Sequence, residues 1–320
     1  MNSTIDTLLL LALPASGKSE LRRYLAHLEK DVAERDLHLG PVVPLDDYPY
    51  VHLMRRISEE LFFMGESPVF FPKRTRAFSD PRDWGTLIHL LNEDYAMLGS
   101  ALPRPESAAT WLFDRLDRAR EKVGAAPAMR GLTSDVRGNL AEALEDEAAA
   151  LWTELAWVGS LWSEGASVVI EFARGGPAGA EMPLLPPFGY AYSLAELSDE
   201  IKRRTSILYV WVTPEESRRK NAERAKPGRD GDASILFHGV PDDVMFREYG
   251  VDDFVWLVEE NGGDSIAVGG EGAVRNIPVT VFDNRADRTS FLRADPGAWS
   301  EDEVATLHAD LSRAFRQLSR

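Results

Sequence analysis

The tripeptide Gly17-Lys18-Ser19 follows an apolar run, and its residue types suit phosphate binding. A tight loop between a strand and a helix turns successive backbone N–H groups inward, and the helix N-terminus adds a partial positive charge. We expect Lys18 to contact the outer phosphates of a nucleotide and the Ser19 hydroxyl to bind magnesium. The neighbouring residues are expected to wrap the phosphates, namely Pro14, Ala15, Ser16 and Glu20.

Two alanines make this loop unusual. The pattern Gly-x4-Gly-Lys-Ser/Thr is complete except at its first glycine, where Ala12 stands, and Ala15 replaces a second common glycine. Alanine adopts negative φ without strain, so we expect negative φ at both positions, whereas Gly17 is least able to take a side chain. A chance Gly-Lys-Ser at a helix start is the alternative, and the preceding apolar run favours a phosphate loop.

Two adjacent carboxylates, Asp46 and Asp47, close a second apolar run. Next to a phosphate loop, one carboxylate can accept the proton of an attacking hydroxyl while the other binds the acceptor or a magnesium-bound water. Asp-Asp-Tyr-Pro also suits a turn without any chemistry. The position of the two aspartates at a strand end favours the functional interpretation. We expect Asp47 and Tyr48 to bind the substrate.

Glu171 lies at the end of a third apolar run, where an acidic residue can hold magnesium or its water shell together with Ser19. The Gly-rich turn that follows would present Arg174 to an anionic group of the substrate. An isolated Glu at a strand end is often only a solvated cap. The order of phosphate loop, paired aspartates and Glu favours the magnesium interpretation.

The motifs resemble those of the P-loop kinases, in which Leu-Pro-x-Ser-Gly-Lys-Ser is a common form of the loop. Leu45-Asp46-Asp47-Tyr48 and Asp80-Pro81-Arg82-Asp83 are similar to stretches in uridine kinase, phosphoribulokinase and their relatives. The resemblance covers the core strands and loops but not most of the long helical segment between them. It implies bound ATP and Mg2+, Asp46 as the catalytic base, and Asn284 near the adenine ring.

A basic helix is predicted to begin after Thr213, because a threonine cap precedes proline and a glutamate in the capping-box position. It resembles the lid helix of nucleotide and nucleoside kinases. The resemblance implies that its arginines, Arg218 and Arg224 above all, neutralise charge on the transferring phosphoryl group. A salt-bridged surface helix is the alternative.

Five short apolar runs with polar C-terminal ends predict the strands that position these residues: 7–13, 41–45, 166–172, 206–212 and 278–282. Their alternation with helices predicts a mostly parallel five-stranded sheet covered by helices on both faces, and the resemblance implies a three-layer α/β/α fold of the P-loop NTPase type. Such sheets bind ligands at the carboxyl ends of their strands. Residues 257–268 add a predicted hairpin around Asn261-Gly262-Gly263-Asp264.

Residues 51–162 are predicted to be a helical insertion within one domain that spans 1–320. A stripe of apolar residues recurs at spacings of three and four and predicts one long amphipathic helix: Leu140, Leu144, Ala148, Leu151, Leu155, Val158 and Trp162. We expect this insertion and residues 235–253 to shape the acceptor pocket.

The composition limits the partners. A net charge of −16 argues against a surface built to bind nucleic acid, and the absence of cysteine excludes thiolate chemistry and cysteine-held metals. No apolar run approaches the length of a membrane helix, and a signal peptide is not recognisable, so we expect a cytoplasmic protein without membrane contact.

The sequence therefore predicts an ATP- and Mg2+-dependent phosphotransferase that acts on a small molecule such as a nucleoside, a sugar or a related metabolite. A P-loop NTPase that serves as a switch, without an acceptor, is the alternative. A nucleic-acid end kinase is less favoured because the chain is acidic. The acceptor and the oligomeric state are left open.

Overall fold

The computed structural model describes residues 4–224, 239–270 and 272–319. Its centre is a six-stranded sheet in the order β2-β3-β1-β4-β6-β5. The first five strands in this order are parallel, and β5 pairs antiparallel with β6 at the edge. The strands are β1 Thr7–Leu11, β2 Val42–Asp46, β3 Ser167–Phe172, β4 Thr205–Trp211, β5 Ser265–Val268 and β6 Arg275–Asp283.

Twelve α-helices are present in the described residues, together with short 3-10 turns at Ser290–Arg293 and Pro296–Ala298. The helices are α1 Lys18–His27, α2 Lys30–Leu37, α3 Tyr48–Phe63, α4 Asp83–Met97, α5 Ala108–Lys122, α6 Ser134–Ser160, α7 Gly189–Ala195, α8 Asp199–Arg204, α9 Pro214–Arg224, α10 Asp242–Arg247, α11 Phe254–Glu260 and α12 Glu301–Leu318.

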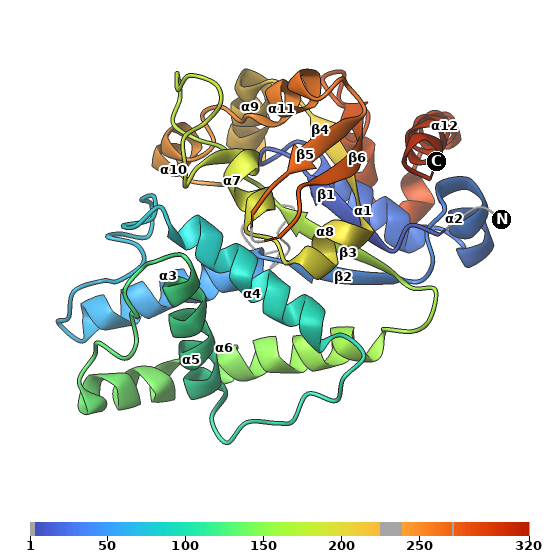
Figure 1. Ribbon diagram of the computed structural model, residues 1–320. Coiled ribbons are helices and arrows are strands. Elements are labelled where there is room, and N and C mark those ends of the chain that lie inside the picture. Colours follow the sequence, from blue (N-terminus) through green and yellow to red (C-terminus); the bar gives the residue numbers. More distant parts are fainter. Residues whose placement is uncertain (1–3, 225–238, 271, 320) are drawn as a thin grey trace.

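Helices cover both faces of the sheet (Figure 1). Successive strand residues point to opposite faces, so Leu8 and Leu10 of β1 pack against α1, α2 and α12, while Leu9 and Leu11 pack against α4, α7, α8 and α11. Both faces of the central strands are therefore buried, which explains their nearly continuous apolar sequence. The α/β class and the mostly parallel sheet are confirmed.

Two predictions about strands need correction. The sheet has six strands where five were expected, because β5 adds an antiparallel edge strand. The hairpin predicted over 257–268 is wrong in its first half, since residues up to Glu260 form α11. The Asn261-Gly262-Gly263-Asp264 turn joins a helix to a strand, because Leu257 and Val258 pack against the sheet from helical positions.

The predicted insertion corresponds to α3–α6, which gather below the sheet in Figure 1. They enclose an apolar core of their own, which continues into Leu13, Val244 and Tyr249 from the sheet side. Loops separate the helices, so the segment is less wholly helical than expected. The long amphipathic helix is confirmed as α6, in which five of the seven predicted residues are buried. Leu155 is only partly buried, and Trp162 lies beyond the end of the helix at Ser160.

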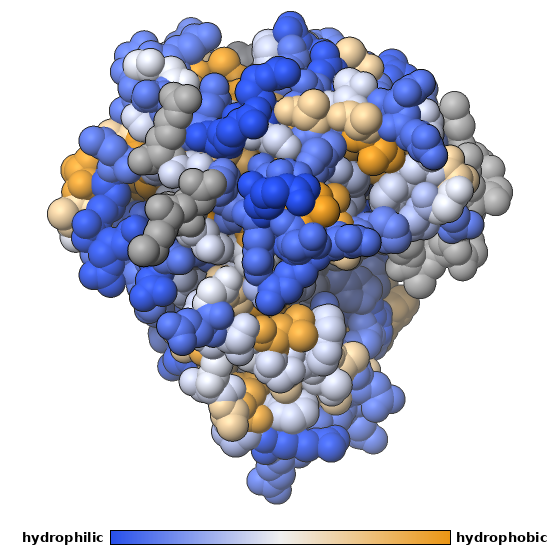
Figure 2. Space-filling model, turned by 90° about the vertical axis from the view of Figure 1, so that its right-hand side faces the viewer, coloured by the Kyte–Doolittle hydropathy of each residue, from blue (hydrophilic) through white to orange (hydrophobic). Residues whose placement is uncertain are grey.

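The surface is mainly hydrophilic, as the net charge of −16 leads one to expect. Figure 2 shows one side of the molecule on which polar side chains dominate and apolar patches are small and separate. Within the described part of the chain, the helices are all too short or too polar to span a bilayer.

Arg115 is expected to be essential for the stability of the insertion. Its buried guanidinium donates to Asp94 at 2.6 Å and to the Tyr50 hydroxyl at 2.8 Å, and Tyr50 in turn donates to Asp94. Arg115→Leu leaves the Asp94 carboxylate buried without its cation, so the free energy of unfolding should fall by about 3–5 kcal/mol. Urea unfolding measures this loss.

Arg118→Leu is the matched control, because Arg118 follows Arg115 by three residues on the same helix but is exposed. Its ion pair with Glu93, at 3.6 Å, is partly solvated. This variant should change the free energy of unfolding by no more than about 0.5 kcal/mol. Equal losses in the two variants would contradict the importance of the buried pair.

Candidate functional site

Residues 12–17 form a tight loop between the end of β1 and α1, in which Gly17 is the N-cap of the helix and Lys18 and Ser19 are its first two residues. Gly17 has φ 101°, which L-residues with side chains rarely adopt. A Cβ at this position would lie 2.3 Å from Thr289 Oγ1 and 2.6 Å from Asn284 Nδ2. The expectation that Gly17 cannot take a side chain is confirmed on both grounds.

Asn284 stabilises this loop from the side that faces away from the cavity described below. Its fully buried amide donates to the Ser16 carbonyl at 2.7 Å and to Thr289 Oγ1 at 2.9 Å, while its oxygen accepts from the Arg288 N–H. Both amide protons are thereby used. Asn284, which the resemblance places near an adenine ring, lies outside the lining of the cavity described below and braces the loop.

Other contacts also fix the loop. The Ser16 hydroxyl donates to the Leu13 carbonyl at 2.7 Å, and Ser217 of α9 donates to the Pro14 carbonyl at 2.7 Å. Glu20, expected at the phosphates, is buried and accepts from Arg293 at 2.7 Å. It too lies outside the cavity lining, because it is on the opposite face of the first helical turn from Lys18.

The prediction of negative φ is wrong for Ala15, whose φ is 58°, whereas Ala12 is not among the residues with positive φ. An alanine in the left-handed region costs about 1–2 kcal/mol. The loop therefore keeps the backbone shape that glycine favours even though its sequence has alanine. Tertiary contacts at Ser16 and Pro14 hold this conformation.

Ala15→Gly should leave the free energy of unfolding unchanged or raise it by up to about 1 kcal/mol, because relief of the left-handed strain offsets the added chain entropy. Ala12→Gly, at a fully buried position without positive φ, should lower it by about 1 kcal/mol. Urea unfolding of both variants compares them directly. An equal loss in both would show that Ala15 is unstrained.

Asp46 and Glu171 lie side by side. They occupy paired positions on the neighbouring parallel strands β2 and β3. Arg22 of α1 bridges them, with Nη1 3.3 Å from Asp46 Oδ2 and Nε 3.2 Å from Glu171 Oε1. Arg22 was not predicted from the sequence as a site residue, although it follows Lys18 by four residues and so shares its helix face.

Burial perturbs Glu171 strongly. The side chain is 2% exposed, and burial raises its pKa to about 7 while the charge of Arg22 acts in the opposite direction. Its Oε1 is buried and forms the ion pair with Arg22 but no hydrogen bond. The charge of Lys18 lowers the pKa values of both Glu171 and Asp47, which places the ammonium group near both carboxylates.

Asp47 and Arg174 form a buried ion pair. Arg174 Nη1 donates to Asp47 Oδ2 at 2.6 Å, and the rest of the guanidinium contacts Ser193 and the Trp84 carbonyl. Burial raises the pKa of Asp47 against the effect of this cation. Asp47 lines the cavity, but Arg174, expected to meet an anionic substrate group, holds Asp47 in place from outside the lining.

The basic helix begins as predicted, since α9 starts at Pro214 and Thr213 Oγ1 accepts from the Glu216 N–H. Arg218 does not line the cavity; it donates to the Gly250 carbonyl, pairs with Glu215 and stacks over Phe246. Of the described residues of α9, Asn221 lines the cavity, while the contacts of Arg218 hold its side chain outside the lining. The Arg224 side chain lies outside the part of the chain that the structure describes.

One cavity of about 410 Å³ joins most of the predicted site. Phosphate-loop residues line one part of it, and Asp46, Asp47, Tyr48 and Glu171 lie at the strand ends. The insertion and residues 239–249 line the remainder, as expected for the segments that were to shape a pocket. The side chains of Lys18 and Ser19 have no hydrogen-bond or ion-pair partner in the described part of the chain.

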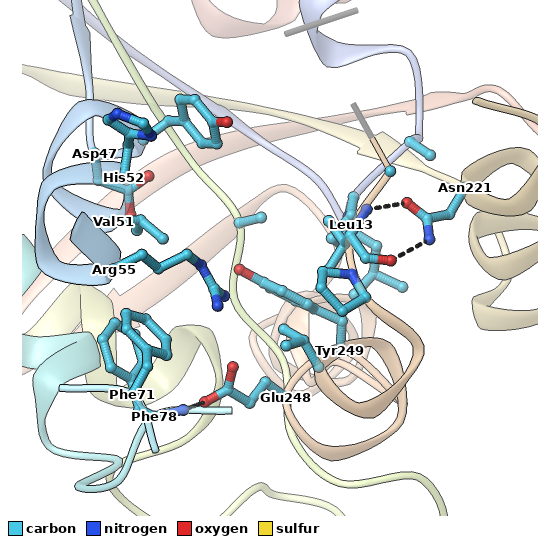
Figure 3. A pocket seen from close by; sticks show the side chains of 18 of the residues that line it. Leu13, Asp47, Val51, His52, Arg55, Phe71, Phe78, Asn221, Glu248 and Tyr249 are labelled. Carbon is cyan, nitrogen blue, oxygen red and sulfur yellow. Dashed lines mark hydrogen bonds between the residues drawn. The ribbon is translucent and has the colours of Figure 1, made fainter. Parts of the chain in front are cut away.

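Several lining residues were missed by the sequence analysis. Figure 3 shows Arg55 of α3 extending into the cavity toward Tyr249, with Glu248 and two phenylalanines beside it. None of these residues belongs to a short motif. Only their neighbourhood in the folded chain distinguishes them from ordinary helix and loop residues.

No protein-family model, curated protein or solved structure matches this chain. Within the described residues there is also no group of three or more acidic or histidine side chains arranged to hold a metal ion. The functional argument therefore depends on the geometry of the cavity.

Proposed function

We propose that this protein is an ATP- and Mg2+-dependent phosphotransferase with a P-loop NTPase fold, acting on a hydroxyl group of a small molecule. The observation that carries the proposal is the continuity of one cavity from the Gly17-Lys18-Ser19 loop, past Asp46, to an aromatic region of the insertion. A switch NTPase needs only the nucleotide part. The additional enclosed space supports a second, small substrate.

In the proposed reaction the backbone N–H groups of the loop and the Lys18 ammonium bind the β- and γ-phosphates. Asp46 accepts the proton of the acceptor hydroxyl as its oxygen attacks the γ-phosphorus, and the bond from that phosphorus to the ADP oxygen breaks. Arg22 positions Asp46 through the ion pair at 3.3 Å. Catalysis is then mostly positioning and charge neutralisation.

The residues present fit a magnesium ion. Ser19 and Glu171 would be its protein contacts, since the Ser19 hydroxyl is unpaired within the described residues and Glu171 Oε1 lacks a hydrogen bond. Magnesium typically takes one or two protein oxygens and completes its shell with phosphate and water, so a larger acidic cluster is unnecessary. The ion would supply charge neutralisation between the phosphates.

The direct test is a screen of ATP consumption in the presence of nucleosides, sugars and hydroxylated vitamin precursors, followed by the mass of each product. We expect at least one compound to accelerate ATP consumption and to gain one phosphoryl group. ATP hydrolysis that no compound accelerates would favour the switch alternative. Failure of Mg-ATP to raise the melting temperature would contradict nucleotide binding itself.

A further inference from the structure

The region of the cavity lined by the insertion has an aromatic wall. Phe71 stacks on Phe78 with ring centres 4.3 Å apart, Phe78 meets Trp84 edge-on at 5.0 Å, and Trp84 meets Tyr249 edge-on at 5.5 Å. All four rings are buried and line the same cavity. Aromatic walls of this kind bind planar, mainly apolar molecules by stacking and edge contacts.

Two polar atoms on this wall are unsatisfied. Glu248 is 3% exposed, and its Oε1 accepts from the Phe78 N–H at 3.0 Å, whereas its Oε2 has no hydrogen-bond partner. Trp84 Nε1 is also buried and forms no hydrogen bond of normal geometry, although its N–H acts as a weak donor toward Glu248 and lowers the pKa of that carboxyl. Buried polar atoms without partners are rare, so the position left open at Glu248 Oε2 indicates space for a hydrogen-bond donor from a ligand.

Arg55 faces the same region without a close ion pair, although its charge lowers the pKa of Glu248. Its guanidinium lies 4.0 Å from the centre of the Phe71 ring and donates to the Arg74 and Arg76 carbonyls, but it forms no ion pair with a described acidic residue. The neighbouring Arg56, in contrast, is paired with Glu59, Glu60 and Glu147. Figure 3 shows Arg55 and the Tyr249 hydroxyl directed toward one another across the cavity.

We propose that these residues form an acceptor pocket for a planar aromatic or heteroaromatic alcohol that carries a hydrogen-bond donor on its ring. The donor pairs with Glu248 Oε2, the ring packs on the aromatic wall, and Arg55 faces an acceptor atom or the ring edge. The alcohol of the same molecule extends toward Asp46. The inference rests on the proposed phosphotransferase function for that last step, but the binding step does not depend on it.

Glu248→Gln provides a sharp test. The Phe78 N–H requires an acceptor, so the glutamine oxygen takes the place of Oε1 and its NH2 group replaces Oε2. The group that faces the ligand then changes from acceptor to donor, and binding should weaken roughly 10- to 100-fold. Glu59→Gln, on the same cavity but in a part-buried pair with Arg56 and away from the aromatic wall, is the control and should change affinity less than about twofold.

Calorimetry with four probes measures binding: 4-aminobenzyl alcohol, cytidine, benzyl alcohol and glucose. We expect 4-aminobenzyl alcohol or cytidine, which carry a ring amino group, to bind more tightly than benzyl alcohol, which lacks the donor, and glucose, which lacks the ring. Tighter binding of 4-aminobenzyl alcohol would indicate that the pocket takes a simple aromatic alcohol. Tighter binding of cytidine would indicate that it takes a ribosylated base. Arg55→Gln should also weaken the preferred probe, and it replaces Glu248→Gln if that variant does not fold.

The inference is overturned if neither amino-bearing probe binds at millimolar concentration, if glucose binds as tightly as they do, or if Glu248→Gln binds like the unmodified protein. Mg-ATP affinity, measured in the same variants, separates the two proposals. If the probe binds, Glu248→Gln weakens it and Mg-ATP does not bind, the pocket proposal stands and the phosphotransferase proposal is contradicted. If Mg-ATP binds and neither amino-bearing probe does, the pocket proposal is contradicted and nucleotide binding stands.

Discussion

Lys18→Ala is expected to lower the rate of phosphoryl transfer roughly 1,000-fold while leaving the fold intact. The Lys18 side chain lines the cavity and pairs with no described residue, so its removal leaves no partner buried and unpaired. The phosphates would lose their main side-chain cation. Initial rates of ATP consumption with an accepted substrate, together with the urea unfolding midpoint, measure the two effects separately.

Lys30→Ala is the matched control for this change. Lys30 is an exposed residue of α2, and its nearest acidic partner is Glu34 at 3.7 Å on the surface. We expect transfer rates equal to those of the unmodified protein. Full activity in Lys18→Ala would contradict the assignment of the phosphate loop, and a large loss in both variants would point to a general effect of charge.

Asp46→Asn should reduce the catalytic rate constant roughly 100- to 10,000-fold and change Mg-ATP affinity little, because asparagine cannot accept the proton of the acceptor hydroxyl. The substitution preserves an oxygen for the Tyr48 N–H, which Asp46 Oδ1 accepts at 2.9 Å. The lost pair with Arg22 is partly solvated and contributes about 1 kcal/mol or less. Steady-state kinetics with saturating Mg-ATP separate the rate constant from binding.

Asp31→Asn controls for the loss of one negative charge, since Asp31 is exposed in the first turn of α2. Its transfer rate should remain unchanged. If Asp46→Asn were equally active, Asp46 would not be the base, and the proton would have to pass to another group. Asp47 would then be the next carboxylate to replace, because it too lines the cavity.

Much of the fold follows from local patterns in the sequence. The five predicted runs agree with β1, β2, β3, β4 and β6 to within a few residues, and the Thr213 cap and the apolar stripe of α6 are where the sequence predicts them. Period, capping and turn chemistry act between residues close in the chain. The edge strand β5 was predicted as the second half of a hairpin and not as a member of the sheet, because its pairing with β6 depends on the finished sheet.

Some residues of the candidate site could likewise be predicted from the sequence, and others could not. Lys18, Ser19, Asp46 and Glu171 are recognisable in the sequence because each follows or ends an apolar strand, and parallel strands bring their carboxyl ends together. Arg55 and Glu248 carry no such mark. They meet across the cavity only after the insertion packs against the segment around α10.

By itself, the sequence determined the strands, the loop and the acidic residues at the strand ends. The tertiary structure alone decided the left-handed Ala15, the brace from Asn284, the pairing of Arg174 with Asp47 and the aromatic wall beside Glu248. The physical reason is distance along the chain. Local preferences act over a few residues, whereas burial, ion pairing and loop strain depend on neighbours that only the packed fold supplies.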